Sequence, residues 1–570
     1  MSFLKPFIKR YIFINPFILF ASLLVIVCAL PLIKLLSFSK ILIFSGNTLI
    51  DLFKDPRFLR AAFNSICIAS ITTLIAGSVG LVLALFVGLT DTHRLHIWSF
   101  IIFLILFLPP TFLAIAWIDI GIHLNHWLNI PNPMYTQTAS IILLSIHLFP
   151  ICFFMILDQL KRIPFHLIEA GKSFGASPRV LLTQIILPLV RGAVVKSAML
   201  IWFSALGHFT FFALLGIPGQ FTTLTTLIYS KLTGFGVNKI DDIVLICMIL
   251  LVIGLAGTYV LKTLTGPAWQ WRVTSQKLTK NTFDSKHTRV FIYGLLCLIC
   301  LSIILPMIKL LLTSFTTKGV MSFSMSHFSL ENYHYIIGNR NIHHAFFNSF
   351  ILALGTAFVL FFQSGLFEYG ALITKRAFFA KARIFFQSLY LMPGSILAIS
   401  LILLVLKPFD WMRFLQLNMI YNTLFIIFIA YMIRFFAFHL NIVHAASDKF
   451  SYKLIESAKS CGATTSSIVR RIFLPLVSPS LFNGSFLVFI LILHEVTVSS
   501  LLPSSETQTL GVVLLSLMEH GDTKATAALC ILITSLLVIF RVLAHQLTKR
   551  SIARTYNLTS DDTASAQTPY

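Results

Sequence analysis

The sequence predicts an all-α transmembrane protein of about twelve helices, arranged as two homologous six-span halves in parallel repeat. Three observations lead to this fold class. Apolar residues make up 57% of the 570 residues and charged residues only 11%, which is more apolar surface than a protein in water can bury. Apolar runs long enough to cross a bilayer, about 20 residues each, recur along the chain. Motifs of the first half also return in the second half at a nearly constant distance.

Each apolar run is expected to form a helix, because lipid offers no partner for an unpaired backbone amide. The first run follows Lys5, Lys9 and Arg10; it is long and lacks a small-residue cleavage site, so we interpret it as a retained span and not as a signal peptide. Twelve spans are predicted near residues 12–36, 61–89, 97–120, 138–158, 192–216, 242–263, 289–313, 346–373, 385–406, 419–444, 481–502 and 525–545.

The charges of the loops predict how these spans are oriented, since Lys and Arg concentrate in cytoplasmic loops. Four loops are rich in these residues: 159–191, 262–289, 374–384 and 445–480. By contrast, loop 121–137 contains no Lys or Arg, and loop 503–524 contains only Lys524. Both termini are therefore expected in the cytoplasm. Loop 37–60 argues the other way, because four basic residues fall on its predicted outer side.

The net charge of +23 does not indicate a nucleic-acid-binding protein. The basic residues are scattered over short loops between apolar runs, and no contiguous basic face appears on a soluble domain. The eight cysteines likewise lie in apolar segments. Cys297 and Cys300 form a C-x-x-C pattern inside one such run, where buried small residues are a better interpretation than a redox or metal site.

An internal repeat divides the chain. The segment Glu169-Ala-Gly-Lys-Ser-Phe-Gly175-Ala recurs 287 residues later as Glu456-Ser-Ala-Lys-Ser-Cys-Gly462-Ala, and a Leu-Pro pair follows each copy. Upstream, Phe63-Asn64-Ser65 recurs as Phe347-Asn348-Ser349 at an offset of 284. The repeat predicts a first half at 1–264, a cytoplasmic linker at 265–288, a second half at 289–546 and a polar C-terminal tail at 547–570.

The repeated segment lies in a long cytoplasmic loop, 159–191 in the first half and 445–480 in the second. Glu169 and Glu456 are expected early in a short helix, where a carboxylate suits the positive helix end. The glycine should then end that helix, since glycine tolerates the left-handed turn. A second amphipathic stretch follows, and the proline should end it before the next span. The product is a helix–turn–helix on the cytoplasmic face, well placed to dock into another protein.

The pattern E-A-A-x-x-x-G, followed by L-P thirteen residues after the glycine, resembles the cytoplasmic loop of binding-protein-dependent ABC importer permeases. In that family the loop is the coupling helix that fits a cleft of the ATPase subunit. Gly171 and Ser457 stand where alanine is usual, and both are small enough for close docking. The resemblance assigns ATPase coupling to Glu169, Ala170, Gly175, Leu187 and Pro188 and to Glu456, Ala458, Gly462, Leu474 and Pro475.

The resemblance also implies partners: two copies of an ABC ATPase subunit at the cytoplasmic face, a periplasmic substrate-binding protein, and the lipid bilayer of the cell inner membrane. The sequence contains no G-x-x-x-x-G-K-[ST] motif, so ATP hydrolysis is expected in a separate subunit and the chain is not expected to be an enzyme. No cofactor is expected.

Six-plus-six fusion in one chain resembles the iron(III) and thiamine permeases of the family. The stretch His494-Glu-Val-Thr-Val-Ser-Ser-Leu-Leu-Pro503, followed by Glu506-Thr-Gln-Thr-Leu510, is similar to the iron(III) type. Ferric iron is therefore the favoured substrate. Thiamine, polyamine and phosphonate stay open as alternatives, because their permeases share the fold and much of the pattern.

Polar groups within spans are costly and suggest function. The fifth span of each half offers such groups as a candidate substrate pathway: His208, Thr210, His494, Glu495 and Thr497. A cation pathway would welcome Glu495 deep in the eleventh span. An equally good interpretation is a packing carboxylate paired with His494, or with Arg434 of the tenth span. Asn64 and Asn348 are expected to bridge helices.

Two histidine pairs, His123 with His126 and His343 with His344, have spacings that suit a metal. No cysteine or carboxylate completes either set in the sequence, so no metal site is expected.

A different class, a proton-coupled secondary transporter using Glu495 and the histidines, would also fit twelve spans in two halves. The paired loops argue against it, because a proton-driven carrier has no need of two docking helices. A membrane-embedded enzyme lacks a convincing nucleophile or metal set.

Overall fold

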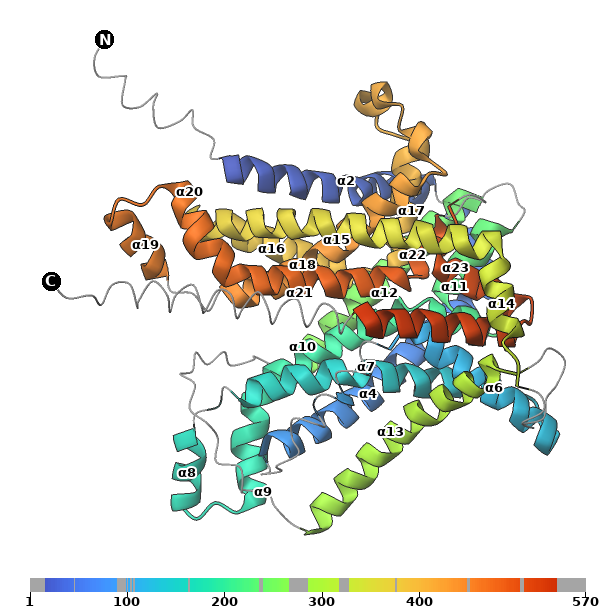
Figure 1. Cartoon of the computed structure of the whole chain (residues 1–570), viewed down its shortest axis with the longest axis horizontal. Coiled ribbons are helices and arrows are strands. Elements are labelled where there is room, and N and C mark those ends of the chain that lie inside the picture. The colour runs from blue at the N-terminus through green and yellow to red at the C-terminus, as the bar shows by residue number, and fades with distance from the viewer. Residues whose placement is uncertain are drawn as a thin grey trace. The chain divides into compact units, whose positions relative to one another are not determined.

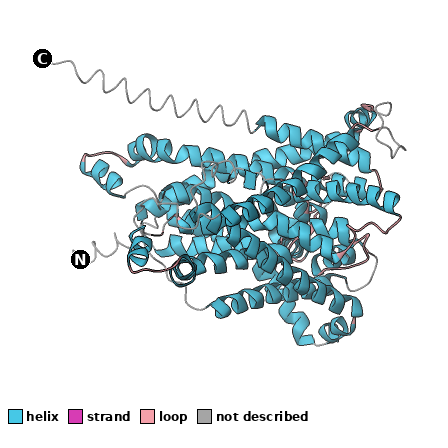
Figure 2. Ribbon diagram, turned by 90° about the horizontal axis from the view of Figure 1, so that it is seen from below, coloured by secondary structure: helices cyan, strands magenta, loops and turns pink. Residues whose placement is uncertain are grey.

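The computed structural model of the chain describes residues 16–45, 47–89, 99, 101–102, 105, 108–161, 163, 165–234, 239–265, 286–316, 328–374, 377–447, 452–502 and 507–540. Nearly all of these residues are helical (Figure 2). Within this part of the chain, ten helices are long and apolar enough to cross a membrane, and a bent helix pair is an eleventh candidate. The predicted all-α transmembrane class is confirmed.

Nine of the spans carry helix labels in Figure 1. They are α2 (Pro16–Ser45), α4 (Pro56–Leu89), α7 (Gln137–Leu160), α10 (Leu187–Leu206), α12 (Lys239–Thr265), α13 (Lys286–Ser314), α15 (Arg340–Thr374), α18 (Leu424–Ser447) and α21 (Leu474–Leu493). The tenth runs from Thr523 to Phe540. Shorter helices outside the loops are α3 (Asn47–Lys54), α6 (Pro110–Leu128), α11 (Leu224–Thr233), α14 (Glu331–Gly338), α16 (Ala377–Leu391), α17 (Gly394–Leu406) and α23 (Leu510–Glu519).

The predicted ninth span, 385–406, is wrong as a single helix. It consists of α16 and α17, which are bent by 102° relative to each other. Pro393 sits at the break with an extended ψ of 134°, and proline both lacks an N–H and disfavours a helical residue before it. Pro109 has the same extended geometry in front of α6. Of the predicted third span, 97–120, the stretch 97–109 lies largely outside the described residues.

The fifth and eleventh spans are displaced towards the N-terminus relative to the prediction. They run from Pro178 to Leu206 and from Thr465 to Leu493, because Pro188 and Pro475 do not end a helix as expected. A π-helical segment precedes each proline, η1 (Leu181–Ile186) and η6 (Val469–Phe473). The wider turn accommodates the missing proline N–H, and the helix continues into α10 or α21.

The described residues form two compact units. Unit 1 contains residues up to 37, 340–513 and those from 532 onward; unit 2 contains 38–339 and 514–531. In unit 1 the ring of Phe17 on α2 lies 5.4 Å from the ring of Tyr369 on α15. In unit 2 the indole of Trp117 on α6 donates a hydrogen bond to the carbonyl of Ser302 on α13 at 3.0 Å. The first helix of each sequence half thus packs mainly with helices of the other half.

The units therefore differ from the halves at 1–264 and 289–546, which stay a prediction about the sequence repeat. The repeat itself is visible in the helices, because α18 begins 287 residues after α7 begins and ends 287 residues after α7 ends. Asn64 donates to the carbonyl of Thr222 at 2.9 Å, and Asn348 donates to that of Gln508 at 3.0 Å. Asn64 also accepts from Gln137, the first residue of α7, at 3.0 Å, so it bridges two helices as predicted; the bond of Asn348 runs from a helix to the segment before α23.

Candidate functional site

The first of the two repeated loops, 159–191, folds as a helix–turn–helix (Figure 1). Helix α8 (Phe165–Ser173) ends in a turn where Gly175 has a φ of 77°. The amide of Ala176 donates to the carbonyl of Gly171 at 3.0 Å, and that of Gly175 donates to Lys172 at 2.9 Å. This bond pair is the Schellman arrangement that closes a helix on a left-handed glycine. The Ser177 hydroxyl then caps α9 (Pro178–Val180), which leads into η1 and α10.

The second loop repeats this geometry around Gly462. Helix α19 (Tyr452–Ser460) ends in a turn where Gly462 has a φ of 79°, and its two closing bonds are both 3.0 Å long. The Thr464 hydroxyl caps α20 (Thr465–Ile468), which continues into η6 and α21. A Cβ added to Gly175 or Gly462 would meet no atom within 4 Å. The backbone conformation, and not crowding, therefore selects glycine at both turns.

Both loops present one face to solvent. Glu169, Ala170 and Glu456 are exposed, and Ala458 is half-buried. Each glutamate is the fifth residue of its helix, and neither first turn contains an acidic residue. The expected interaction with the positive helix end is therefore wrong. The leucine–proline pairs, Leu187-Pro188 and Leu474-Pro475, lie in the first turns of α10 and α21.

The inner faces of the loop helices are apolar and close-packed. Ile168 and Ile455, each directly before the repeated glutamate, are buried. A Cβ added to Gly171 would lie 2.7 Å from a methyl group of Leu181, so α8 approaches η1 closely at this glycine. In both loops the apolar side of the short helix is therefore buried against the protein, and its polar side is exposed.

Glu495 does not lie deep in a span, because α21 ends at Leu493. It occupies the break before the short helix α22 (Thr497–Leu501). Its carboxylate accepts hydrogen bonds from the amide of Val498 at 3.0 and 3.1 Å and from that of Ser499 at 3.3 Å. It also pairs with the guanidinium of Arg434 at 3.4 Å. The predicted partner Arg434 is therefore present, and these contacts favour the packing interpretation over an open cation pathway.

The break is tightly packed around this ion pair. A Cβ added to Gly511 would lie 2.5 Å from the carbonyl oxygen of Glu495. A Cβ on Gly394, at the start of α17, would collide with the Arg434 guanidinium. His494 and Thr497 flank Glu495 and are both buried. The three predicted residues of the second half therefore lie together in one dense region.

The first half carries a different pair at the same place. His208 and Thr210 follow the end of α10 at Leu206, and the imidazole of His208 lies 6.0 Å from that of His147, centroid to centroid. By the 287-residue offset, His147 and His208 occupy the positions of Arg434 and Glu495. A charged pair in one half thus corresponds to two imidazoles in the other.

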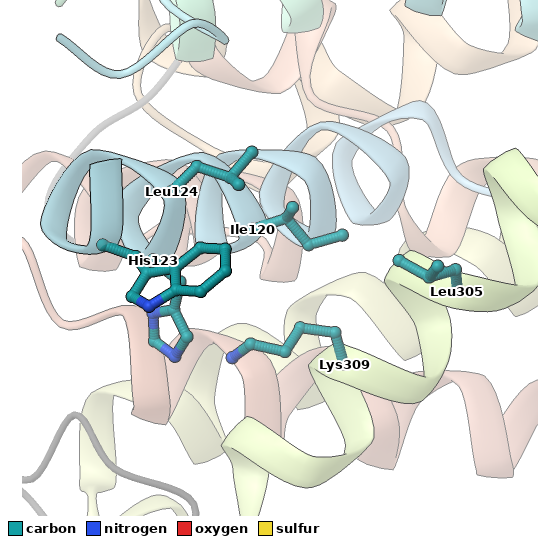
Figure 3. A pocket seen from close by; sticks show the side chains of 6 residues that line it. Ile120, His123, Leu124, Leu305 and Lys309 are labelled. Carbon is teal, nitrogen blue, oxygen red and sulfur yellow. The ribbon is translucent and has the colours of Figure 1, made fainter. Parts of the chain in front are cut away.

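The two histidine pairs that suit a metal by spacing lie in different units, His123 and His126 in unit 2 and His343 and His344 in unit 1. His123 and Trp127 of α6 and Lys309 of α13 line a cavity of about 310 Å³ (Figure 3). The Lys309 ammonium is bound at 2.7 Å by the buried carboxylate of Asp119, which also accepts from Thr313 at 2.6 Å. His343 and His344 are exposed on α15. Among the residues that the structure describes, no cluster of three or more His, Cys, Asp or Glu side chains could hold a metal ion.

Comparison with known families decides the class of the chain. The family described as binding-protein-dependent transport system inner membrane component matches it twice, over residues 80–269 and 370–554. The chain belongs to this family. The permease thus contains the family domain once in each sequence half, and each match includes one of the two glycine-turn loops.

Curated relatives of the permease agree with this membership. It is 22% identical over 411 residues to the probable ABC transporter permease protein y4fN of Sinorhizobium fredii, covering 71% of this chain and 70% of the relative. It is 24% identical over 428 residues to the Fe(3+)-transport system permease protein FbpB 2 of Haemophilus influenzae, covering 70% and 74%. A shorter match, 31% over 102 residues, links it to the spermidine/putrescine transport system permease protein PotC of Haemophilus influenzae, covering 18% and 40%.

Sequence reasoning missed two buried carboxylates of the permease, Asp119 and Glu368. Both are almost fully buried, and each binds a basic side chain from another helix. The only signal for them in the sequence was a single acidic residue inside an apolar run. Such a residue indicates a partner within the membrane, but the partner could not be chosen from sequence alone.

Proposed function

We propose that this permease forms the substrate pathway of an ABC importer and is driven by a separate ATPase through its two loop helices. The observation that carries the proposal is the glycine-closed helix that the chain builds twice, at Gly175 and Gly462, with a face left exposed each time. Two copies of an ATPase subunit would each receive one such helix at the cytoplasmic face. A short rigid helix in a partner's cleft transmits motion better than a flexible loop.

Under this proposal the coupling residues are those that build or border the turns. Glu169, Ala170 and Gly175 supply the first exposed helix, and Leu187 and Pro188 join its exit to α10. The second loop uses the corresponding residues Glu456, Ala458, Gly462, Leu474 and Pro475. The ATPase dimer would pull on both helices as it closes and would rock the spans between inward and outward access.

We also propose that the substrate is ferric iron, handed over by a periplasmic binding protein, in the cell inner membrane with both chain termini in the cytoplasm. The support is the similarity of 494–510 to the iron(III) type and one long curated relative named for Fe(3+) transport. Polyamine and other permeases also match, over shorter stretches, so thiamine, polyamine and phosphonate are the alternatives. Uptake of radiolabelled iron, putrescine and thiamine by cells that carry or lack the gene would separate them.

The residues His208, Thr210, His494, Glu495 and Thr497 remain our candidates for the wall of the pathway. They lie at the breaks after α10 and α21, where helix ends leave backbone groups to be satisfied within the protein. Because Glu495 is bonded to α22 and to Arg434, we propose that it holds the helix break in shape and does not bind the substrate itself. The proton-coupled alternative has no further support, since family membership accounts for the paired loops.

The coupling proposal is tested by changing both turn glycines to valine. A β-branched residue resists positive φ, so Gly175→Val with Gly462→Val should distort both loop helices and leave the spans intact. In proteoliposomes with the ATPase and the binding protein, we expect transport per ATP to fall about ten-fold or more, because a residue held at an unfavourable φ costs about 1–3 kcal/mol and about 1.4 kcal/mol corresponds to a factor of ten. Normal coupling in the double variant would contradict the proposal.

Gly521→Val is the matched control for this experiment. Gly521 also has a positive φ, 77°, and closes α23 with the same pair of bonds. It lies outside both loops, so the same backbone conflict there should lower stability without changing the ratio of transport to hydrolysis.

A further inference from the structure

A buried polar network joins three helices of unit 1. The Glu368 side chain on α15, only 1% exposed, accepts hydrogen bonds from Arg383 of α16 at 2.7 Å and from the Ser447 hydroxyl of α18 at 2.8 Å. Its second oxygen also lies 3.3 Å from Nδ1 of His444. A buried carboxylate is costly unless it is paired and hydrogen-bonded, so these donors hold α15, α16 and α18 together.

The network also fixes the state of His444. Nη1 of Arg383 lies 2.9 Å from Nε2 of His444. Because a guanidinium can only donate, this ring nitrogen must accept. Nδ1 then carries the hydrogen and donates to Glu368, so a neutral imidazole satisfies both neighbours. The donors and acceptors that Glu368, Arg383, His444 and Ser447 present to one another are therefore complementary.

This network lies where the chain enters the second loop, at the end of α18. Tyr369, the residue after Glu368 on α15, contacts the part of the loop through which the chain leaves, α20 and η6. Ser447 is the last residue of α18, and the next helix in the chain is α19 of the loop. Tyr369 donates its hydroxyl hydrogen to the carbonyl of Thr465, the first residue of α20, at 3.4 Å. Its ring also packs 5.2 Å from that of Phe473 in η6. Two consecutive residues of α15 therefore contact the two ends of one loop.

The first half has apolar residues in these places. At the 284-residue offset, Ala84 and Leu85 correspond to Glu368 and Tyr369. At the 287-residue offset, Leu157 and Leu160 correspond to His444 and Ser447. Ala84, Leu157 and Leu160 are all buried. The hydrogen bonds that Glu368, Tyr369, His444 and Ser447 make at the second loop therefore have no counterpart at these four positions of the first half.

We propose that Glu368 and Tyr369 form a clamp that holds both ends of the second coupling loop on α15, whereas the corresponding positions beside the first loop are apolar. The proposal rests on the coupling function proposed above and adds that the two loops are mechanically unequal. Directional bonds join α15 to the last residue of α18, which precedes α19, and to the first residue of α20, which follows the glycine turn; force on the loop would pass through these two points into α15 and α16. Glu368, Tyr369, His444 and Ser447 are positioning residues, since they act through the loop.

The first test measures loop motion directly, in the full permease–ATPase complex. A nitroxide is attached to the exposed Cys461 in a chain whose other accessible cysteines, Cys67, Cys297 and Cys300, are alanine. Tyr369→Phe and Ser447→Ala each delete one hydroxyl, and the loss of one hydrogen bond should raise the released population about two- to ten-fold. We expect the label to become correspondingly more mobile in both variants. Unchanged mobility in both would overturn the clamp.

The first loop supplies the matched control. Phe174 is 91% exposed and corresponds to Cys461 at the 287-residue offset. A label on Phe174→Cys, with Cys461→Ala, should keep its mobility when Tyr369 or Ser447 is changed. An equal rise at both labels would show general loosening of the protein and would also overturn the clamp.

The second test measures transport per ATP hydrolysed in proteoliposomes. Tyr369→Phe and Ser447→Ala should lower this ratio about two- to ten-fold. Tyr333→Phe, which deletes a phenol hydroxyl bonded to Ser314 at 2.7 Å in unit 2, should leave it unchanged. If Gly462→Val uncouples but the two clamp variants do not, the clamp is wrong and the coupling function stands. If Gly462→Val is also normal, the coupling function fails, and the clamp fails with it.

Discussion

Glu495 has the sequence features of a transport site, but its contacts with α22 and Arg434 give it a structural role. Its oxygens are bound by two backbone amides of α22 and by one guanidinium, which leaves little capacity for a passing cation. Polarity within an apolar run and the partner Arg434 were both readable from the sequence. The depth was not, because a continuous apolar run does not reveal where α21 ends.

Replacing Glu495 with Gln therefore has a distinct expected result. The amide oxygen can still accept from α22, but Arg434 loses its counter-charge. Breaking a buried pair costs up to about 3–5 kcal/mol, less here because the Arg434 side chain is 25% exposed. We expect the amount of folded protein in the membrane, measured by size-exclusion chromatography in detergent, to fall. A normal protein level with reduced uptake of a cationic substrate would instead support the pathway role.

The first half suggests the rescue for this variant. His147 and His208 fill the same two positions without a carboxylate. Arg434→His combined with Glu495→His removes both charges and copies that pair. The double variant should recover more folded protein than Glu495→Gln alone, because no buried charge is left unpaired.

The two halves pack three corresponding helices against one another with side chains of different size at the same positions. In the first half, Gly80 of α4 lies against Cys152 of α7, which contacts Ser197 of α10 at 3.3 Å. In the second half, Ser364 bonds His439 at 2.8 Å, and Gly484 makes room for that imidazole. In the first half the glycine that faces the middle helix, α7, belongs to α4. In the second half the glycine that faces the middle helix, α18, belongs to α21. Small residues let membrane helices approach closely, and this exchange could not be predicted without knowing the contacts.

Gly80→Ala tests this packing. An added Cβ would lie 2.6 Å from Cβ of Cys152 and 2.8 Å from the carbonyl oxygen of Phe149, so α4 and α7 would have to separate. We expect a loss of about 1–3 kcal/mol, the usual cost of overpacking. Thermal unfolding in detergent would show a lower midpoint. Gly77→Ala on the same helix is the control: its Cβ would meet nothing within 4 Å, so the midpoint should hold or rise slightly. Equal midpoints for the two variants would refute the close approach.

Across the whole chain, the features with a local signature were the predictable ones. Hydropathy located most spans, and the repeated glycine motif located both loops with their turn geometry. Features that depend on distant partners were not predictable. Hydropathy cannot show that α13 packs with α6, or that residues 16–37 pack with helices of the second half, because lipid-compatible surfaces look alike along the sequence. The π-helical segments before Pro188 and Pro475 were not predicted either, because a proline in a sequence usually indicates the end of a helix.

The orientation of the chain is the last prediction. Both glycine-turn loops follow the fourth span of their half, and α7 and α18 are related by one constant offset, so a parallel repeat must place both loops on the same side. Loop charge assigns that side to the cytoplasm. Reporter fusions at Lys277, Lys381 and the C-terminus should therefore all report the cytoplasm, and fusions near Asn125 and Ser505 should report the outside. The basic loop 37–60 makes this a demanding test, because its charge opposes the assignment. Opposite signals from Asn125 and Ser505 would mean that the halves are inverted; the two loops could then not both reach an ATPase dimer, and the coupling proposal would fall with the topology.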